Sequence, residues 1–469
     1  MGKKELCKGL LFQDCELAIL RNAIDIADKR KGETKMNSPE IRKIIAIVEN
    51  FIRRKSLICY GGTAINNILP KDDQFYDKDI EIPDYDFFSP TPLEDAKELA
   101  DIYFKAGFEE VEAKSGVHFG TFKVFVNFTP IADITLISNE IYKNIKKDAI
   151  HVKGIKYAPP NYLRMAMYLE LSRPNGDVSR WEKVLKRITL LNKHYPLIHK
   201  NCHTIEFQRP MDTPNDEEED LYKIVQHGLI DQSVVFFGGF ANSLYSKYMP
   251  RKFGRKLEKF PDFDVLTEDA FETATIIKEK LEHKGFKKIS IARHDNIGDI
   301  ISEHYELNVG GETVCFFYTP MACHSYNEIS FNNTRIKVAT VDTMMSFYLA
   351  FLYTNRPYYD KNRILCMSQY LFTVQQKNRL AQKGLLRRFS INCYGDQPTL
   401  ETMRAEKSAK YEELKDKRNT KEFDMWFLRY VPREMVKKNQ GDQKVVKSKK
   451  KTMKTKKKNN KRNKTWKLF

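Results

Sequence analysis

One sequence pattern occurs twice in this chain, about 178 residues apart. In the first copy, an apolar segment beginning at Leu57 is followed by Gly61-Gly62-Thr63 and then by Pro83-Asp84-Tyr85-Asp86. In the second copy, apolar residues from Val234 lead into Gly238-Gly239-Phe240 and then into Pro261-Asp262-Phe263-Asp264. Self-similarity at a fixed period indicates a duplicated domain. We therefore expect two tandem α+β domains, each with a mixed sheet and flanking helices.

Length and composition are compatible with two such domains. The chain has 469 residues, of which 41% are hydrophobic, and this is enough for two ordinary cores. No apolar run reaches 18 residues, and the first residues lead into no secretory segment, so we expect no membrane association. The eight cysteines are scattered without CxxC pairs, from which we expect reduced, mostly buried thiols and an intracellular protein.

The positive charge is concentrated at the end of the chain. Residues 437–469 contain fifteen Lys or Arg and one acidic residue, so they carry +14 of the formal net charge of +18. Their low apolar content predicts a disordered polycation. It could serve solubility or targeting, or it could contact RNA phosphates. The lysines that we expect to contact RNA are Lys449, Lys450, Lys451, Lys456, Lys457 and Lys458.

The remaining sequence predicts five segments. Residues 1–36 form an N-terminal helical segment, and 37–208 form the first domain. Residues 209–220, with two prolines and an acidic run, are expected to be a solvated linker. Residues 221–436 form the second domain with a helical extension, and 437–469 are the tail.

Three aspartates of the first copy have a spacing that suits metal-dependent chemistry. Asp84 and Asp86 lie at i and i+2 of a strand, so they share one face, and Asp133 lies on a later alternating strand. Carboxylates so close together repel unless cations lie between them. In proteins, two Mg²⁺ or Mn²⁺ ions commonly lie between such carboxylates and remove the repulsion. The turn Gly61-Gly62-Thr63 before a helix would suit a triphosphate, through close backbone approach, helix amides and a hydroxyl.

The combination of these motifs resembles a known superfamily. A strand, Gly-Gly-Thr, a helix, Asp-x-Asp and a later Asp are similar to the nucleotidyltransferases that include DNA polymerase beta. Two sequence motifs resemble those of the poxvirus-type poly(A) polymerase catalytic subunit, in the form carried by giant DNA viruses. They are Tyr60-Gly61-Gly62-Thr63-Ala64-Ile65-Asn66 and Pro83-Asp84-Tyr85-Asp86-Phe87-Phe88. The resemblance covers about residues 37–370. It implies that Asp84, Asp86 and Asp133 are catalytic metal ligands and that Gly61, Gly62 and Thr63 bind ATP.

Two features qualify the resemblance. Twenty residues separate Thr63 from Asp84, about twice the usual gap, so a loop is inserted before the aspartates. In the second copy Phe240 replaces the hydroxyl of Thr63, and we expect Cys315 at or near the position of Asp133. We therefore expect the second domain to be degenerate. A second active site that borrows Glu312 is the alternative.

The resemblance implies a polynucleotide adenylyltransferase that adds AMP from ATP to the 3′ end of viral mRNA without a template. Its expected partners are single-stranded RNA and a second copy of the chain, because the basic tail and the spare domain could replace a processivity subunit. The expected location is the cytoplasm of the infected host cell, with packaging in the virion as a further option. Uridylyl transfer or oligoadenylate synthesis is the alternative enzymatic reading, and a noncatalytic RNA-binding scaffold is the alternative from another class.

Overall fold

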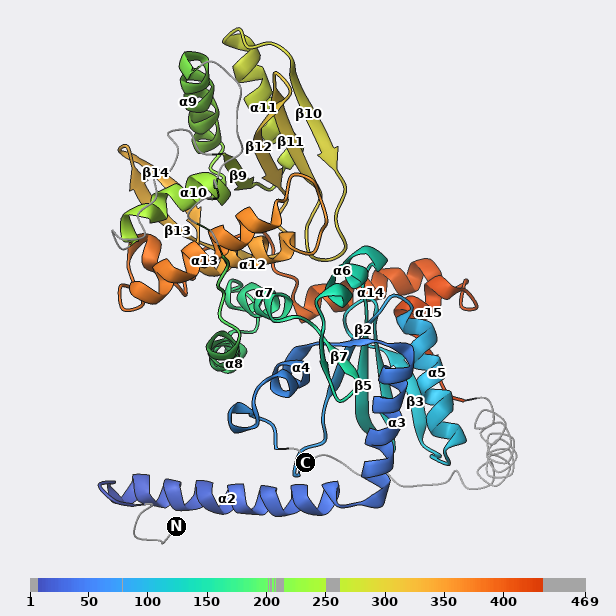
Figure 1. Ribbon diagram of the computed structural model, residues 1–469. Helices are drawn as coiled ribbons and strands as arrows, with labels where there is room; N and C mark the ends of the chain where they lie inside the picture. Colours follow the sequence, from blue (N-terminus) through green and yellow to red (C-terminus); the bar gives the residue numbers. More distant parts are fainter. Residues whose placement is uncertain are drawn as a thin grey trace, which may run out of the picture.

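The computed structural model describes residues 7–77, 79–200, 202, 205, 207, 215–249 and 262–432. In this part of the chain, two eight-stranded mixed sheets lie in two halves of the molecule, each with its own helices (Figure 1). The protein is thus a mixed α/β structure with two sheets.

The first sheet contains both parallel and antiparallel pairs. Its strands are β1 (Ile58–Cys59), β2 (Tyr85–Ser89), β3 (Val111–Ser115), β4 (Thr121–Val126), β5 (Thr129–Leu136), β6 (Ile150–Val152), β7 (Ile155–Tyr157) and β16 (Arg429–Tyr430). They lie in the order β16-β3-β4-β5-β2-β1-β7-β6. The central pair, β2 and β5, is parallel.

Helices α3 (Pro39–Lys55) and α5 (Pro92–Lys105) pack on this sheet. The other helices of this part of the chain are α2 (Phe12–Met36), α4 (Gly61–Ile68), α6 (Asn139–Lys147), α7 (Pro160–Leu171) and α8 (Trp181–His194). Strand β4 alternates, and its buried Phe122, Val124 and Val126 face α5, which packs on β3, β4 and β5. Thr121, Lys123 and Phe125 therefore lie on the opposite face.

The second sheet repeats the order of the first. Its strands are β8 (Val235–Phe237), β9 (Phe263–Leu266), β10 (Ile289–His294), β11 (His304–Val309), β12 (Glu312–Tyr318), β13 (His324–Phe331), β14 (Thr334–Ala339) and β15 (Cys393–Tyr394). Their order is β10-β11-β12-β9-β8-β14-β13-β15, so β8, β9 and β12 stand where β1, β2 and β5 stand in the first sheet. The helices that follow in the chain are α9 (Asn215–Asp231), α10 (Gly238–Tyr245), α11 (Ala270–His283), α12 (Val341–Phe351), α13 (Lys361–Lys377), α14 (Leu400–Leu414) and α15 (Lys421–Phe427).

The two halves meet along α7 and α12, which occupy equivalent places in the two copies. The backbone N–H of Ser325 donates to the Ser172 carbonyl at 2.8 Å, and the Asn144 amide donates to the Tyr353 carbonyl at 2.8 Å. The rings of Tyr162 and Tyr353 pack edge to face with centroids 5.2 Å apart. This interface thus combines apolar packing with hydrogen bonds between the two halves.

The C-terminal extension lies on the first half and not on the second. Helices α14 and α15, drawn in red in Figure 1, lie beside the first sheet, and β16 pairs with β3. Lys97 forms an ion pair with Asp424 at 2.6 Å, and the Tyr430 hydroxyl donates to Asp101 at 2.7 Å. The expected assignment of the extension to the second domain therefore needs correction. Nothing in the local sequence of 400–430 identifies which sheet edge it pairs with.

The acidic run is also placed differently from the expectation. Residues 215–231 form α9, so the run 216–220 belongs to a helix and not to a solvated linker. Residues 209–214 of the predicted linker lie outside the described residues.

Six of the eight cysteines form disulfides, which contradicts the expectation of reduced thiols. The pairs are Cys7–Cys15, Cys202–Cys366 and Cys323–Cys393, while Cys59 and Cys315 are free and buried. Two pairs join cysteines 164 and 70 residues apart, which only the folded chain brings together. The cysteines therefore give no support to an intracellular location.

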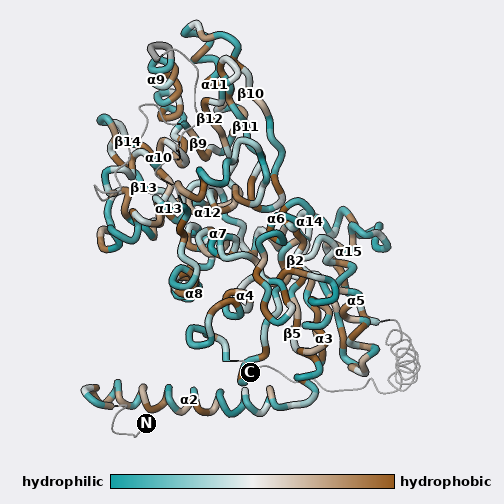
Figure 2. Tube along the Cα trace, viewed as in Figure 1, coloured by the Kyte–Doolittle hydropathy of each residue, from teal (hydrophilic) through white to brown (hydrophobic). Residues whose placement is uncertain are grey.

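Helix α2 stands apart from both halves. It buries none of its side chains, and apolar residues recur along it (Figure 2). Leu17, Leu20 and Ile24 are each about half exposed. Among the described residues, the search for a helix both long and apolar enough to cross a bilayer found no candidate.

Candidate active site

The first Gly-Gly turn is shaped by its contact with an aspartate. Gly61 begins α4 with a φ of +70°, and a Cβ at this position would lie 2.6 Å from Oδ2 of Asp86. The backbone N–H of Tyr60 donates to the Asp86 carbonyl at 2.9 Å. Only glycine combines this left-handed conformation with so close an approach. The N-terminus of α4 is thereby held against the carboxylate.

The three predicted aspartates lie on neighbouring strands. Asp86 on β2 is the register partner of Asp133 on β5, and Asp84 precedes β2 by one residue. Burial, and then the charges of Asp84 and Asp133, raise the pKa of Asp86 to about 7. Burial and the charge of Asp133 also raise the pKa of Asp84. The site thus concentrates negative charge that a cation would relieve.

A lysine now supplies part of that relief. Lys123 on β4, the register partner of Asp133, forms an ion pair with its Oδ2. In the described part of the chain, no three Asp, Glu, His or Cys side chains are gathered closely enough to hold a metal ion as they stand. The strands therefore bring the three carboxylates to one region, while the Asp133 side chain is turned toward Lys123.

Thr63 has a different position from that expected of a phosphate ligand. Its side chain is buried, and its hydroxyl donates to the Asp84 carbonyl at 2.6 Å. The hydroxyl thus fixes α4 to the residue that opens the carboxylate strand. A contact between Thr63 and a phosphate stays a prediction.

Sequence reasoning missed a basic face of α8 that points toward the Gly-Gly turn. A Cβ at Gly62 would lie 3.0 Å from both terminal nitrogens of Arg187, which places the guanidinium directly over the turn. The charges of Arg180 and Lys183 lower the pKa values of Asp86 and Asp84, respectively, against the effect of burial. These three residues recur at i, i+3 and i+7, a spacing that places them on one helix face. This spacing is visible in the sequence and could have revealed the basic face.

The inserted loop covers the same turn. The guanidinium of Arg187 donates to the Tyr76 hydroxyl at 2.5 Å and lies 4.9 Å from the centre of the Phe75 ring. Asn66 of α4 accepts hydrogen bonds from the backbone N–H groups of Phe75 and Tyr76 at 2.8 and 2.9 Å. The loop therefore orients Arg187, and the Tyr76 hydroxyl lies where an anion above Gly62 would lie.

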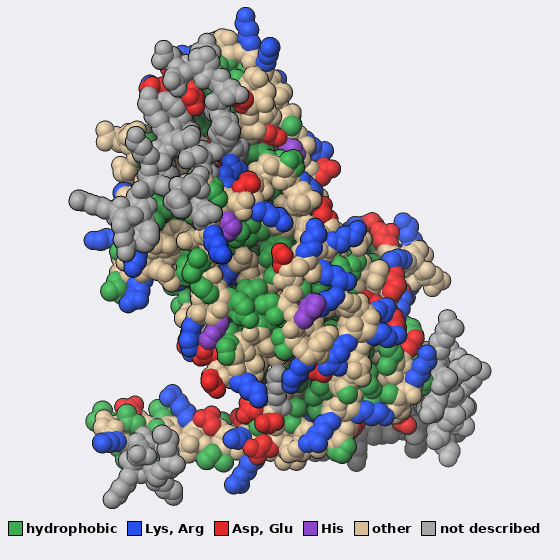
Figure 3. Space-filling model, viewed as in Figure 1, with side chains coloured by type: hydrophobic (Ala, Val, Ile, Leu, Met, Phe, Trp, Pro, Cys, Tyr) green, Lys and Arg blue, Asp and Glu red, His purple; other side chains and the backbone are tan. Residues whose placement is uncertain are grey.

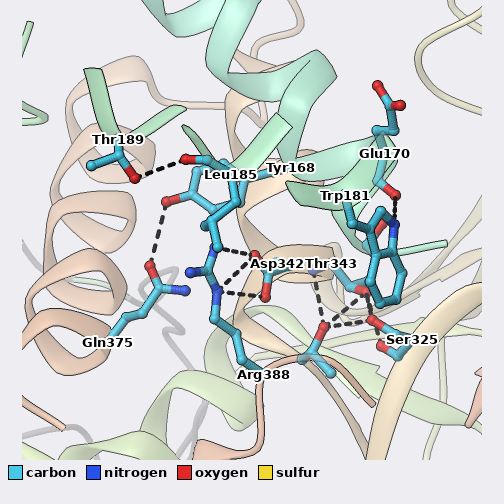
Figure 4. A network of polar contacts seen from close by, with 12 residues as sticks. Tyr168, Glu170, Trp181, Leu185, Thr189, Ser325, Asp342, Thr343, Gln375 and Arg388 are labelled. Atoms are coloured by element: carbon cyan, nitrogen blue, oxygen red, sulfur yellow. Dashed lines mark hydrogen bonds and ion pairs between the residues drawn. The ribbon is translucent and has the colours of Figure 1, made fainter. Parts of the chain in front are cut away.

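Both halves of the molecule position α8. The Trp181 indole donates to the Glu170 carbonyl at 3.0 Å, which ties the start of α8 to α7 (Figure 4). Trp181 also packs on Phe389, which follows α13, with ring centroids 5.6 Å apart. Beside it, Arg388 forms an ion pair with the buried Asp342 at 2.7 Å. The second half thus supports the helix that carries Arg187.

The second copy keeps the turn but not the third carboxylate. Gly238 has a φ of +77°, and a Cβ there would lie 2.0 Å from Oδ2 of Asp264. The register partner of Asp264 on β12 is Phe316. Cys315, expected at or near the position of Asp133, is the neighbour of the equivalent residue, and its buried side chain lies on the other face. The Phe316 ring packs on Tyr358 with centroids 5.1 Å apart.

The predicted RNA contacts at Lys449, Lys450, Lys451, Lys456, Lys457 and Lys458 lie outside the described residues. On the face seen in Figure 3, Lys and Arg side chains are spread among acidic ones over both halves. This agrees with the small net charge of the chain before the tail.

Comparisons with known proteins address the same region. Residues 46–177 match the family of poly(A) polymerase catalytic subunits. A protein of African swine fever virus assigned as such a subunit is 35% identical over 178 residues, which are 37% of this chain and 36% of that protein. A protein of Acanthamoeba polyphaga mimivirus with the same assignment is 33% identical over 185 residues, 38% of this chain and 30% of that protein.

The fold resembles that of a solved structure over nearly its whole length. The crystal structure of the Megavirus polyadenylate synthase superposes with a TM-score of 0.75 at 20% identity and covers 93% of this chain and 90% of that chain. These matches confirm the resemblance to the poly(A) polymerase catalytic subunits. The matched residues span about a third of the African swine fever virus and mimivirus proteins.

Proposed function

We propose that this protein is a template-independent poly(A) polymerase that transfers AMP from ATP to the 3′ hydroxyl of viral mRNA. The observation that carries the proposal is that the family match and the candidate site residues fall in the same segment of the chain. The segment that matches the poly(A) polymerase catalytic subunits, 46–177, contains the Gly61-Gly62 turn, Asp84, Asp86 and Asp133. In the structure, these residues meet near the start of β2, beside the middle of β5.

The groups around the turn suit a triphosphate. The two glycines allow phosphate oxygens to approach the backbone, and the first amides of α4 carry the positive end of the helix dipole. Arg187 lies over Gly62. ATP would displace the Tyr76 hydroxyl from this place, and the guanidinium would then bind two phosphate oxygens.

The carboxylates suit divalent ions. Mg²⁺ prefers hard oxygen ligands, and the raised pKa of Asp86 shows that negative charge is costly there without a cation. Asp84, Asp86 and Asp133 would hold the ions once Asp133 leaves Lys123. Bound Mg²⁺ would stabilise the charge on the attacking and leaving oxygens.

The protein's own residues orient the two reactants. The RNA 3′ hydroxyl loses its proton to solvent, and its oxygen forms a bond to the α-phosphorus of ATP. The bond from the α-phosphorus to the bridging oxygen of the β-phosphate breaks, and pyrophosphate leaves with the electron pair. Arg187 and the Gly61-Gly62 amides would bind the departing pyrophosphate, and Asp133 would help to bring the RNA oxygen into line for attack.

The test is nucleotide addition by the purified full chain. Short RNA is incubated with Mg²⁺ or Mn²⁺ and each NTP in turn, and products are resolved by length. We expect extension with ATP. Asp84→Ala or Asp86→Ala should reduce it more than a thousandfold, about 4 kcal/mol in barrier. Extension by the double variant would refute the assigned site.

The same assay distinguishes the other readings. Preference for UTP would indicate a uridylyltransferase, and products without a primer would indicate an oligoadenylate synthetase. Binding of RNA with no nucleotide addition would indicate a noncatalytic scaffold. The retained carboxylate cluster argues against the scaffold, because mutually repelling aspartates are costly without a metal function.

The proposal extends to the architecture and the assembly. We propose two tandem polymerase-beta-like nucleotidyltransferase domains, the second degenerate, since Phe316 replaces the third carboxylate. We propose a homodimer, supported by the exposed apolar side chains of α2. A monomer by light scattering would refute it. Action in the cytoplasm of the infected host cell is proposed from the resemblance to viral relatives.

A further inference from the structure

A row of register partners crosses the first sheet from the carboxylates to its edge. Asp86 pairs with Asp133, and Asp133 pairs with Lys123. Lys123 then pairs with Lys114 on β3, and Lys114 pairs with Arg429 on β16. Register partners project from the same face of a sheet. One row therefore leads from two acidic to three basic side chains, all on the face away from α5.

The basic part of this row is accessible to solvent. The side chains of Lys123, Lys114 and Arg429 are 38%, 43% and 85% exposed. Lys114 and Arg429 share a single carboxylate, Glu112, at 3.3 and 3.4 Å. One carboxylate cannot neutralise two cations, so positive charge remains available to a ligand.

An aromatic ring lies in the neighbouring row of partners, on the same face of the sheet. Phe125 on β4 is the register partner of Glu112, and the Lys114 ammonium lies 4.1 Å from the centre of its ring. Proteins commonly bind single-stranded nucleic acid through cationic side chains beside an aromatic ring on which a base stacks. From Asp133 to Arg429, the row crosses three strand spacings, about 14 Å.

The direction of β16 connects the row to the basic tail. Since Tyr430 pairs with Ala113 and Arg429 with Lys114, the chain runs toward Val111, the start of β3. Val111 pairs with Val126, and Phe125 pairs with Pro130 near the start of β5, the end of the sheet at which Asp84 lies. Residue 432 therefore leaves the sheet on the side of the carboxylates, and only four residues separate it from the lysine-rich segment 437–469.

We propose that Lys123, Lys114 and Arg429 form a track for the RNA backbone that runs from the catalytic carboxylates to the start of the basic tail. This inference rests on the proposed function, because it takes RNA as the ligand. When Asp133 turns to the metal ions, Lys123 is released to a phosphate. Lys114 and Arg429 bind the next phosphates, and Phe125 stacks with a base.

The experiment compares three double variants of the full chain in RNA binding by fluorescence anisotropy at several salt concentrations. Lys114→Gln with Arg429→Gln removes two phosphate contacts. The log-log salt slope should become less negative by about 1.4, and affinity at 0.1 M salt should fall about tenfold to thirtyfold. The charge-conserving pair Lys114→Arg with Arg429→Lys should bind as the wild type does, which shows that edge strand β16 tolerates substitution.

The matched control is Lys278→Gln with Lys280→Gln on α11 of the second half. These lysines are also paired with carboxylates and about one third exposed. Affinity and salt slope should not change. In the nucleotide-addition assay, the track variant should need more of a ten-nucleotide primer for half-maximal rate. A dinucleotide primer, whose single internal phosphate can be held by Lys123 alone, should be used as well as by the wild type.

Wild-type affinity and salt slope in the Lys114→Gln, Arg429→Gln variant would overturn the track. Equal losses in the α11 control would do the same, because the effect would then be one of net charge. If the wild-type protein bound RNA through the track but added no nucleotide, the proposed function would be refuted and the track would still stand. Failure of one proposal is thus separable from failure of the other.

Discussion

Asp86→Asn should stabilise the metal-free protein in a pH-dependent way. The raised pKa of Asp86, about 7, means that the folded state binds the proton more tightly than the unfolded chain does. The contribution of this group to stability is therefore fully present below about pH 4 and is lost as pH rises through about 7. Asparagine remains neutral throughout, so the variant escapes this loss.

The magnitude follows from the gap between the two pKa values. A rise from an ordinary value of about 4 to about 7 corresponds to about 4 kcal/mol, of which roughly two thirds develops between pH 5 and pH 8. Solvent beside the half-buried carboxylate reduces the effect, and we expect about 1.5 kcal/mol over this range. For a domain of this size, that corresponds to about 3–6 °C in Tm.

The assay is thermal unfolding of both proteins in EDTA at intervals from pH 5 to pH 8. The difference in Tm, variant minus wild type, should grow with pH and level off above about 7. Adding Mg²⁺ at pH 8 should then raise the Tm of the wild type and have little effect on Asp86→Asn, because a ligand is lost. The control Asp264→Asn, in the second copy, should keep the Mg²⁺ response.

A Tm difference that stays constant between pH 5 and pH 8 would refute the reasoning, because Asp86 would then have an ordinary pKa. An equal Mg²⁺ response in Asp86→Asn and the wild type would show that the ion binds elsewhere.

Three further predictions concern activity. Asp133→Asn should be nearly inactive, whereas Asp262→Asn with Asp264→Asn should leave turnover within about threefold, and equal losses in a steady-state assay would show that both copies catalyse. Arg187→Ala should raise the KM for ATP about tenfold or more, since the guanidinium binds phosphate, and Arg187→Lys should raise the KM less. An unchanged KM in Arg187→Ala would show that Arg187 does not belong to the site. Deletion of 440–469 should make the salt slope of RNA binding less negative by about 3.5 if five lysines bind phosphates, and an unchanged slope would return the tail to solubility or targeting.

Local patterns were sufficient to predict the elements that carry the carboxylates. The alternation of apolar residues around Asp133 and the Asp-x-Asp spacing depend on neighbours in the chain, and the structure has β5 and β2 at these places. The glycine at 61 was predicted for close backbone approach, and the structure shows that it also makes room for Asp86.

Features that depend on distant residues were missed. The sequence placed Cys315 at or near the position of Asp133 but did not identify Phe316 as the equivalent residue, because register depends on pairing that the sequence does not display. The disulfide Cys202–Cys366 and the position of Arg187 over Gly62 depend on how separate elements pack. Whether Asp84, Asp86 and Asp133 bind metal stays a prediction, since Asp133 is paired with Lys123.

Strand β16 has a consequence for how the protein is made. The ribosome releases β3 more than 300 residues before it releases Arg429 and Tyr430, so the nascent first sheet exposes the unpaired edge of β3 through most of synthesis. An open edge can recruit a strand from another nascent chain. A fragment that ends after the matched segment, at residue 177, would keep this edge open permanently. We therefore expect such fragments to aggregate. In the full chain, β16 covers this edge and so protects the sheet that holds the carboxylates from pairing with other chains.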